Sequence, residues 1–357
     1  MRICLVASSR FPISEPFAGG LEAMTHGLAA ELVRRGHEVT LFAAPGSDPA
    51  LPVSHLAPAA FSVSDLAMTD VNAPSATWLA EHHAYLDLML RLSRGGAAEF
   101  DVVHNNSLHH LPVAMASSLG VPVVTTLHTP PLPFVESAIH LGPGAGASSF
   151  VAVSDFTSRS WAHVVGSEVI HNGVDLDRWR FGHGGGPAVW SGRLVPEKAP
   201  HEAMDACRLA GVPLVLVGPV HDRDYYRTEV EPRLGRGIEY RGHLDHRELA
   251  RLLRTASVAV ITPAWDEPYG LVASEAMASG TPVAGYARGA LPEVVGPDGG
   301  VLVTPGDVEA LAAAVRTARR LDRAACRRHA ELTCSIERMV DDYERCYRAV
   351  VDGPVAA

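Results

Sequence analysis

Short apolar runs alternate with helical stretches in two successive sets, and this alternation restricts the fold of the chain more than any other feature. Strands that are covered on both faces read as continuous Val, Ile and Leu runs, and parallel strands need crossover helices between them. The pattern therefore predicts an α/β protein with parallel sheets. The expected strands lie at 3–7, 38–43, 101–104, 122–127 and 150–153, and then at 188–191, 214–217, 238–241, 258–261, 282–286 and 300–303.

The two sets are separated by a segment that has the composition of a linker. It covers residues 171–186 and contains Asn172-Gly173, which suits a tight turn with positive φ, and the glycine-rich run 182–186, which we expect to be flexible. A chain of 357 residues is also long enough for two domains of about 170 residues each. We predict domains at 1–170 and 187–335, followed by a C-terminal segment at 336–357.

Charge and cysteine content limit the partners and the compartment. The formal net charge of −10 disfavours nucleic acid, and no segment offers 18 consecutive apolar residues for a transmembrane helix. The N-terminal run is too short for a signal peptide, and the five cysteines form no C-x-x-C pair. We expect a cytoplasmic protein with neither a disulfide framework nor a zinc site. The oligomeric state stays open.

Two carboxylates flank a glycine turn in the second half. Gly270 opens a predicted helix, and the free N–H groups and dipole of a helix N-terminus favour a phosphate. Glu275, inside that helix, is placed to accept hydrogen bonds from ribose hydroxyls, and Glu267 precedes the turn. Two glutamates eight residues apart also arise by chance, so the pair alone is equally well a solvated helix start.

The surrounding string resembles a known enzyme family. The run Glu267-Pro-Tyr-Gly-Leu-Val-Ala-Ser-Glu275 is similar to the donor-site signature of glycosyltransferase family 4, as are Gly19-Gly20-Leu21-Glu22, His171-Asn172-Gly173-Val174-Asp175 and Gly192-Arg193-Leu194-Val195-Pro196-Glu197-Lys198. The resemblance extends along almost the whole chain. It implies a GT-B fold, with two Rossmann-like, doubly wound domains facing each other across a cleft and a last helix that crosses back to the first domain.

The resemblance also implies a reaction and its charged residues. Members transfer a sugar from a nucleoside diphosphate to a hydroxyl acceptor with retention of configuration, and Arg193 and Lys198 match the residues that bind the diphosphate. Fixed cations are what the growing negative charge on a departing phosphate requires. Glu267 is expected beside the donor sugar, positioning its hydroxyls rather than serving as an assured covalent nucleophile. Ala199 stands where the family usually has glycine.

Further donor contacts follow from the same resemblance. Gly19 and Gly20 end a long loop and open a helix, where a backbone without Cβ atoms approaches a phosphate closely. No glycine precedes Gly19, so the G-x-G-x-x-G motif of dinucleotide-binding oxidoreductases is absent. The remaining donor-binding candidates are Gly218, His243, Leu244, Gly270, Leu271, Val272 and Glu275.

Polar residues after two strands of the first set are candidates for the sugar and acceptor sides. His128 follows the run 122–127, and the resemblance implies that it contacts the donor sugar. His104, Asn105 and Asn106 lie at the end of the run 101–104 and just past it, and are placed on the acceptor side together with Glu22. We expect a small soluble molecule or a saccharide as the acceptor.

A D-x-D sequence at Asp222-Arg223-Asp224 raises the question of a metal. In another glycosyltransferase fold such carboxylates bind a divalent ion that bridges the diphosphate. Here Arg193 and Lys198 already serve the phosphates, so we interpret the sequence as a solvated turn or helix start. The expected enzyme is metal-independent and uses its sugar nucleotide as a co-substrate without a cofactor. Uridine, guanosine and adenosine donors stay open, as do an epimerase, a phosphorylase and a non-catalytic sugar-nucleotide sensor.

Overall fold

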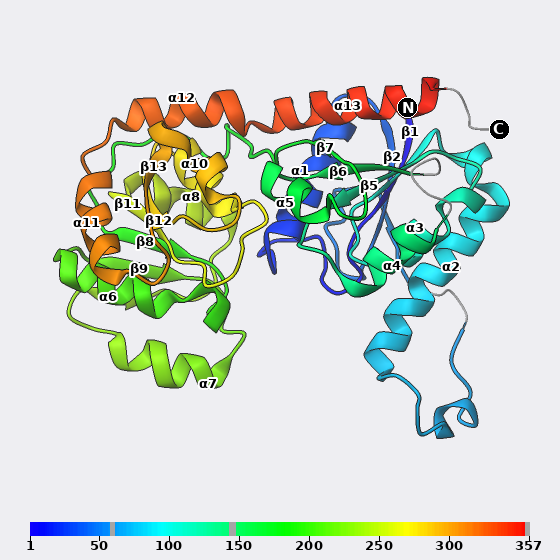
Figure 1. Cartoon of the computed structure of the whole chain (residues 1–357), viewed down its shortest axis with the longest axis horizontal. Helices are drawn as coiled ribbons and strands as arrows, with labels where there is room; N and C mark the ends of the chain where they lie inside the picture. The colour runs from blue at the N-terminus through cyan, green and yellow to red at the C-terminus, as the bar shows by residue number, and fades with distance from the viewer. Residues whose placement is uncertain (58–60, 143–147, 354–357) are drawn as a thin grey trace.

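The protein consists of two α/β domains that lie side by side, as a computed structural model shows (Figure 1). The structure describes residues 1–57, 61–142 and 148–353. Residues 171–186 connect the domains along one edge, and helices α12 and α13 run along the top of both (Figure 1). Within the described residues, no helix is both long and apolar enough to cross a membrane.

The N-terminal domain is built on a seven-stranded sheet in the described part of the chain, with the order β3-β2-β1-β4-β5-β6-β7. Each neighbouring pair is parallel. The order starts in the middle and reverses between β1 and β4, which is the doubly wound arrangement. Its strands are β1 (Arg2–Val6), β2 (Glu38–Ala43), β3 (Val53–His55), β4 (Val102–Asn105), β5 (Val123–Leu127), β6 (Ser148–Ala152) and β7 (Glu168–Val169).

The C-terminal domain repeats this plan with six described strands in the order β10-β9-β8-β11-β12-β13. All of its pairs are parallel, and the order reverses between β8 and β11. Two doubly wound sheets confirm the predicted α/β fold class. The strands are β8 (Ala188–Ser191), β9 (Leu214–Val217), β10 (Ile238–Tyr240), β11 (Val258–Ile261), β12 (Val283–Tyr286) and β13 (Gly300–Val303).

Helices cover both faces of each sheet because the strands are apolar on both sides. In the N-terminal domain they are α1 (Gly20–Arg34), α2 (Ala76–Glu99), α3 (Leu111–Ala114), α4 (Pro133–Leu141) and α5 (Asp155–Trp161), with short 3₁₀ turns at Ala67–Thr69 and Ala116–Ser118. In the C-terminal domain they are α6 (Pro200–Ala210), α7 (Arg223–Tyr225), α8 (His246–Thr255), α9 (Leu271–Ala278), α10 (Leu291–Gly299), α11 (Val308–Ala318) and α12 (Arg323–Thr333), with 3₁₀ turns at Pro196–Lys198 and Glu231–Arg233 and a π turn at Tyr226–Val230. The chain then enters α13 (Ile336–Asp352).

Several short elements of the N-terminal domain were not predicted, among them β3, β7 and α4. The edge strands β3 and β7 have three and two residues, too few to form a recognisable apolar run. Helix α4 has nine residues and begins at Pro133, in a region where no helix was predicted. The sequence also predicts a helix at 76–94, which does form, but α2 continues through two glycines to Glu99. Short elements thus escape a reading that depends on periodicity.

The glycine-rich end of the linker is not flexible, contrary to the expectation. The N–H groups of Gly182, Gly184 and Gly186 donate to the carbonyl oxygens of Ser279, Arg254 and Thr255 at 3.2, 3.2 and 2.7 Å. A Cβ at position 182 would lie 2.2 Å from the Arg254 oxygen. The glycines are therefore needed for close approach to the C-terminal domain.

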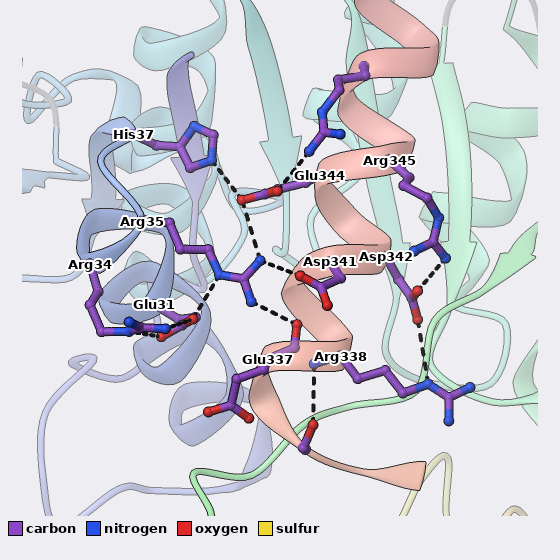
Figure 2. A network of polar contacts seen from close by, with 12 residues as sticks. Glu31, Arg34, Arg35, His37, Glu337, Arg338, Asp341, Asp342, Glu344 and Arg345 are labelled. Carbon is purple, nitrogen blue, oxygen red and sulfur yellow. Dashed lines mark hydrogen bonds and ion pairs between the residues drawn. The ribbon is translucent and has the colours of Figure 1, made fainter. Parts of the chain in front are cut away.

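Helix α13 belongs to the core of the N-terminal domain. Its apolar face, including Ile336, Met339 and Tyr343, is buried in the same cluster as residues of β1 and α1. On its polar side, the Arg35 guanidinium at the end of α1 contacts Asp341 at 2.5 Å and donates to the Glu337 carbonyl oxygen at 2.9 Å (Figure 2). The last residues of the segment predicted at 336–357, namely 354–357, lie outside the described part.

Candidate active site

A cleft of about 420 Å³ lies between the two domains. It is lined by residues that follow the carboxyl ends of strands in both sheets, where ligands of doubly wound folds bind. The cleft brings together most of the predicted residues. Those that line it are Gly19, Gly20, Glu22, His128, Arg193, Lys198, Gly218, His243, Leu244, Glu267, Gly270, Leu271, Val272 and Glu275.

The Lys198 ammonium forms an ion pair with the Glu267 carboxylate across 69 residues of sequence. Lys198 ends the 3₁₀ turn after β8, and its Nζ also lies 5.2 Å above the centre of the Trp265 ring. Thr262 fixes the turn because its hydroxyl donates to the Lys198 carbonyl oxygen at 3.0 Å. The cation and carboxylate are thus held at one point of the cleft wall by the loops after β8 and β11.

Arg193 is less constrained than Lys198. Its side chain is 37% exposed, and its guanidinium Nη2 lies 3.9 Å from Oε1 of Glu197, the nearest carboxylate oxygen. At that distance the pair has no direct hydrogen bond and contributes little to stability. The Arg193 side chain is therefore available to an anion that enters the cleft.

The N-terminus of α9 forms the floor of this wall. Gly270 precedes the helix with φ at +91°, and a Cβ there would lie 2.6 Å from the Leu291 side chain. The backbone N–H groups that open α9 are free to bind an anion. Glu275 lies within the helix, and burial raises the pKa of its carboxyl group to about 8. The closest partner of the carboxylate is His246, whose Nε2 lies 3.8 Å from Glu275 Oε1.

Glycines and a buried carboxylate from the start of α1 form the opposite wall. A Cβ at Gly20 would lie 3.7 Å from the Leu271 side chain, so α1 and α9 face each other across the cleft. Burial raises the pKa of the Glu22 carboxyl group, while its backbone hydrogen bonds and the Arg193 charge act in the opposite direction. Glu22 and Arg193, from different domains, therefore influence each other electrostatically.

His128 follows β5, and its ring is held in place by Asn106, the residue after β4. Its Nε2 lies 2.8 Å from Asn106 Oδ1, and burial lowers the pKa of the imidazole to about 3. An amide oxygen only accepts, so Nε2 carries the proton and Nδ1 is left as an acceptor. A neutral ring with a free acceptor is suited to a sugar hydroxyl.

Three residues placed on the acceptor side do not line the cleft, so that expectation needs correction. His104 is fully buried, with its Nδ1 2.6 Å from the Tyr347 hydroxyl and its Nε2 2.8 Å from Thr126 Oγ1. Asn105 is also fully buried, and its Oδ1 accepts from the Ser107 hydroxyl at 2.6 Å. Asn106 reaches the cleft only through its bond to His128. His104 and Asn105 lie within β4 rather than after it, which places them inside the sheet and not on the cleft.

The D-x-D sequence lies outside the cleft lining. Asp222 caps α7 by accepting from the Tyr225 N–H at 2.9 Å, and Asp224 is an exposed partner of Arg227. The interpretation as a helix start is confirmed. A different potential metal site occurs among the described residues, formed by His82, His109 and His110.

Sequence reasoning missed the residues that join the two walls. The Glu293 carboxylate accepts from the N–H groups of Asp155 and Phe156 at 2.8 and 3.2 Å, so a residue of α10 caps helix α5 of the other domain. Ser154 Oγ donates to the Pro268 carbonyl oxygen at 2.6 Å. The only signal in the sequence was that Glu293 and Pro268 belong to the same string as Glu267 and Glu275.

Two family models match the chain. The model described as Glycosyltransferase Family 4 matches residues 18–178, and the one described as Glycosyl transferases group 1 matches residues 182–331. Together they span both walls of the cleft.

Comparisons with individual proteins agree with these matches. A glycogen synthase of Mycobacterium tuberculosis is 32% identical over 390 residues, covering 96% of this chain and 91% of the relative. An MMP alpha-(1->4)-mannosyltransferase of Mycolicibacterium hassiacum is 29% identical, with 88% of each protein covered. The crystal structure of Anabaena HepE in complex with UDP and glucose superimposes with a TM-score of 0.74 at 21% identity, covering 98% of this chain and all of the other.

Proposed function

The chain belongs to glycosyltransferase family 4 and has the GT-B fold, and from this premise we propose that it transfers a sugar from a nucleoside diphosphate to a hydroxyl acceptor with retention and without a catalytic metal. The observation that carries the proposal is the position of Lys198, Arg193 and Glu267 beside the N-terminus of α9 in a single cleft.

The charges of this wall match the charge changes of the reaction. The diphosphate competes with Glu267 for Lys198 and forms an ion pair with Arg193, which Glu197 holds only weakly. The N–H groups at the start of α9 donate hydrogen bonds to the remaining phosphate oxygens. Glu267, released from Lys198, then accepts from hydroxyls of the sugar and stabilises positive charge at the anomeric carbon. The departing phosphate oxygen takes the proton of the acceptor hydroxyl on the same face, so configuration is retained.

The other cleft residues position the donor. In this proposal Glu275 binds the ribose hydroxyls and the backbone at Gly218, His243 and Leu244 binds the base, since all four residues line the cleft. The neutral His128 accepts from a sugar hydroxyl through Nδ1. These groups do not select among uridine, guanosine and adenosine. A saccharide is the favoured acceptor, because relatives carry the names glycogen synthase and mannosyltransferase.

The proposal is tested by donor turnover in a defined mixture. The protein is incubated with UDP-glucose, ADP-glucose or GDP-mannose and a panel of saccharides in excess EDTA, and NMR follows the anomeric coupling of the product. We expect an acceptor-dependent product with the configuration of the donor. An inverted product would contradict retention, and a rate restored only by manganese would contradict metal independence. Donor conversion without an acceptor would indicate an epimerase, phosphate-dependent cleavage a phosphorylase, and binding without turnover a sensor.

A further inference from the structure

Three histidines form a cluster in the N-terminal domain, outside the residues that line the cleft. His82 belongs to α2, and His109 and His110 precede α3 directly. One ring nitrogen from each residue lies within 4.8 Å of the other two. Imidazole nitrogens are the ligands that zinc, copper and nickel share, so this set of atoms has the chemistry of a transition-metal site.

The nitrogen atoms of the cluster are available for a ligand. His82 Nδ1 is buried and has no hydrogen-bond partner among the described residues. Buried polar atoms normally have a partner, so an unpaired one points to a bound water or ion. His109 Nδ1 accepts from the Leu111 N–H at 3.2 Å, which leaves its Nε2 for a metal.

Aromatic neighbours hold two of the rings in place. The Trp78 ring stacks on His82 with centres 4.8 Å apart, and the Tyr85 ring stacks on His109 with centres 4.5 Å apart. Arg10 is the cation near His109, and its guanidinium pairs with Glu81 at 3.1 Å, which reduces its repulsion of a second cation. Tetrahedral ligands at metal–nitrogen distances of about 2.0–2.1 Å lie about 3.3 Å from one another, so nitrogens that lie within 4.8 Å have to close up by at most about 1.5 Å.

We propose that His82, His109 and His110 bind one divalent transition-metal ion of the zinc class. Three histidines leave a fourth coordination position open for water or an anionic group. The ion links α2 to the segment before α3, two elements that lie together beside the sheet (Figure 1). Leu108, next to His109, lines the cleft. The ion therefore stabilises the N-terminal wall of the cleft and leaves the wall with Lys198 and Glu267 unchanged.

Cobalt provides the test, because tetrahedral Co²⁺ with imidazole ligands absorbs visible light. The full-length protein is treated with chelator, dialysed and titrated with Co²⁺, and Zn²⁺ is then added to displace it. We expect saturation at one equivalent. His82→Gln and His110→Gln should each weaken binding at least tenfold, while His83→Gln, which alters a histidine of the same helix outside the triad, should bind like the wild type.

Two results would overturn the site: no saturable Co²⁺ spectrum in the wild type, or equal binding in all three variants. Circular dichroism without metal checks that each variant folds, and His110→Gln decides the question if His82→Gln does not fold. A chelator effect on turnover that persists in a folded, metal-free His110→Gln protein would instead contradict the proposed metal-independent transfer. The two proposals therefore fail in distinguishable ways.

Discussion

Polar residues lie near the carboxyl ends of strands in both domains, but these residues have different surroundings. In the C-terminal domain, Lys198 and Arg193 follow β8 and reach the cleft as side chains with partial exposure. In the N-terminal domain, His104 and Asn105 lie at the end of β4 and are fully buried. A polar residue at the end of a strand is thus available to a ligand only where no further element covers it.

Helix α13 is the element that makes the difference. It crosses to the N-terminal domain (Figure 1) and contacts β4 and β5, where Tyr343 and Tyr347 meet Thr126 and His104. The Tyr347 hydroxyl satisfies His104, and the Tyr343 hydroxyl lies 3.0 Å from Thr126 Oγ1. The N-terminal domain therefore uses these polar groups to join distant parts of the chain. In the C-terminal domain, the partly exposed charged side chains remain available to a ligand.

The largest effect expected from this comparison is the loss of turnover when a residue of the charged wall, formed by Arg193, Lys198 and Glu267, is removed. Lys198→Ala, Arg193→Ala and Glu267→Ala should each lower kcat by two to four orders of magnitude, because each removes about 3–5 kcal/mol of transition-state stabilisation. Steady-state donor turnover measures this effect. Arg227→Ala removes an exposed, ion-paired arginine of the same domain and should leave turnover unchanged. Near-native turnover in all three variants would refute the assignment of the charged wall.

A substitution of the buried His104 should lower the stability of the protein rather than its turnover. His104→Ala leaves the Tyr347 hydroxyl without its partner and opens a cavity, so the free energy of unfolding should fall by about 3 kcal/mol. Urea denaturation measures the change, and His55→Ala at an exposed position serves as the control. Turnover per folded molecule should stay within about threefold of the wild type. A loss of turnover without a loss of stability would give His104 a role in the cleft after all.

The pH dependence of stability should have opposite signs for two buried histidines of the N-terminal domain and for Glu275 of the C-terminal domain. Burial lowers the pKa values of His104 and His128 to about 3, so the stability they contribute is present above about pH 6.5 and is lost as the pH falls toward 3. Burial raises the pKa of Glu275 from its usual value of about 4.5 to about 8, so its contribution is complete below pH 4.5 and is lost as the pH rises through 8.

Glu275→Gln isolates the second of these effects. The amide cannot ionise, so the variant should gain about 4 kcal/mol relative to the wild type between pH 5 and pH 8.5. Urea denaturation at several pH values measures the gain, and Glu239→Gln at an exposed site is the control. Parallel stability curves for Glu275→Gln and the wild type would show that Glu275 is ionised throughout this range.

The smallest effect concerns the loop that carries Lys198. Ala199 has φ at +43° and ψ at +51°, a left-handed conformation that L-residues rarely adopt, and Pro200 follows it. Ala199→Gly relieves the strain but adds freedom to the unfolded chain, so we expect a net gain of about 0.5 kcal/mol. Thermal unfolding measures the gain, with Ala310→Gly in α11 as a destabilising control. A loss of stability at position 199 equal to that at 310 would contradict the inferred strain.

The strands with long apolar runs were predictable because a strand that is covered on both faces is built mainly from apolar residues. The motif glycines and charges were predictable because the backbone at Gly270 and the charge of Lys198 are local requirements. The edge strands β3 and β7 and helix α4 were not, since elements of that length have no periodic signature. The glycines at 182–186 were misinterpreted as flexible because composition does not reveal close packing.

By itself, the sequence determined the fold class, the family and the charged residues of one wall, because these depend on local periodicity and on short motifs. Only the tertiary structure decided which polar residues face the cleft. Burial of His104, capping of α5 by Glu293 and the meeting of His82 with His109 join residues that are far apart in the chain. Such contacts follow from the packing of whole elements, and no local pattern in the sequence records them.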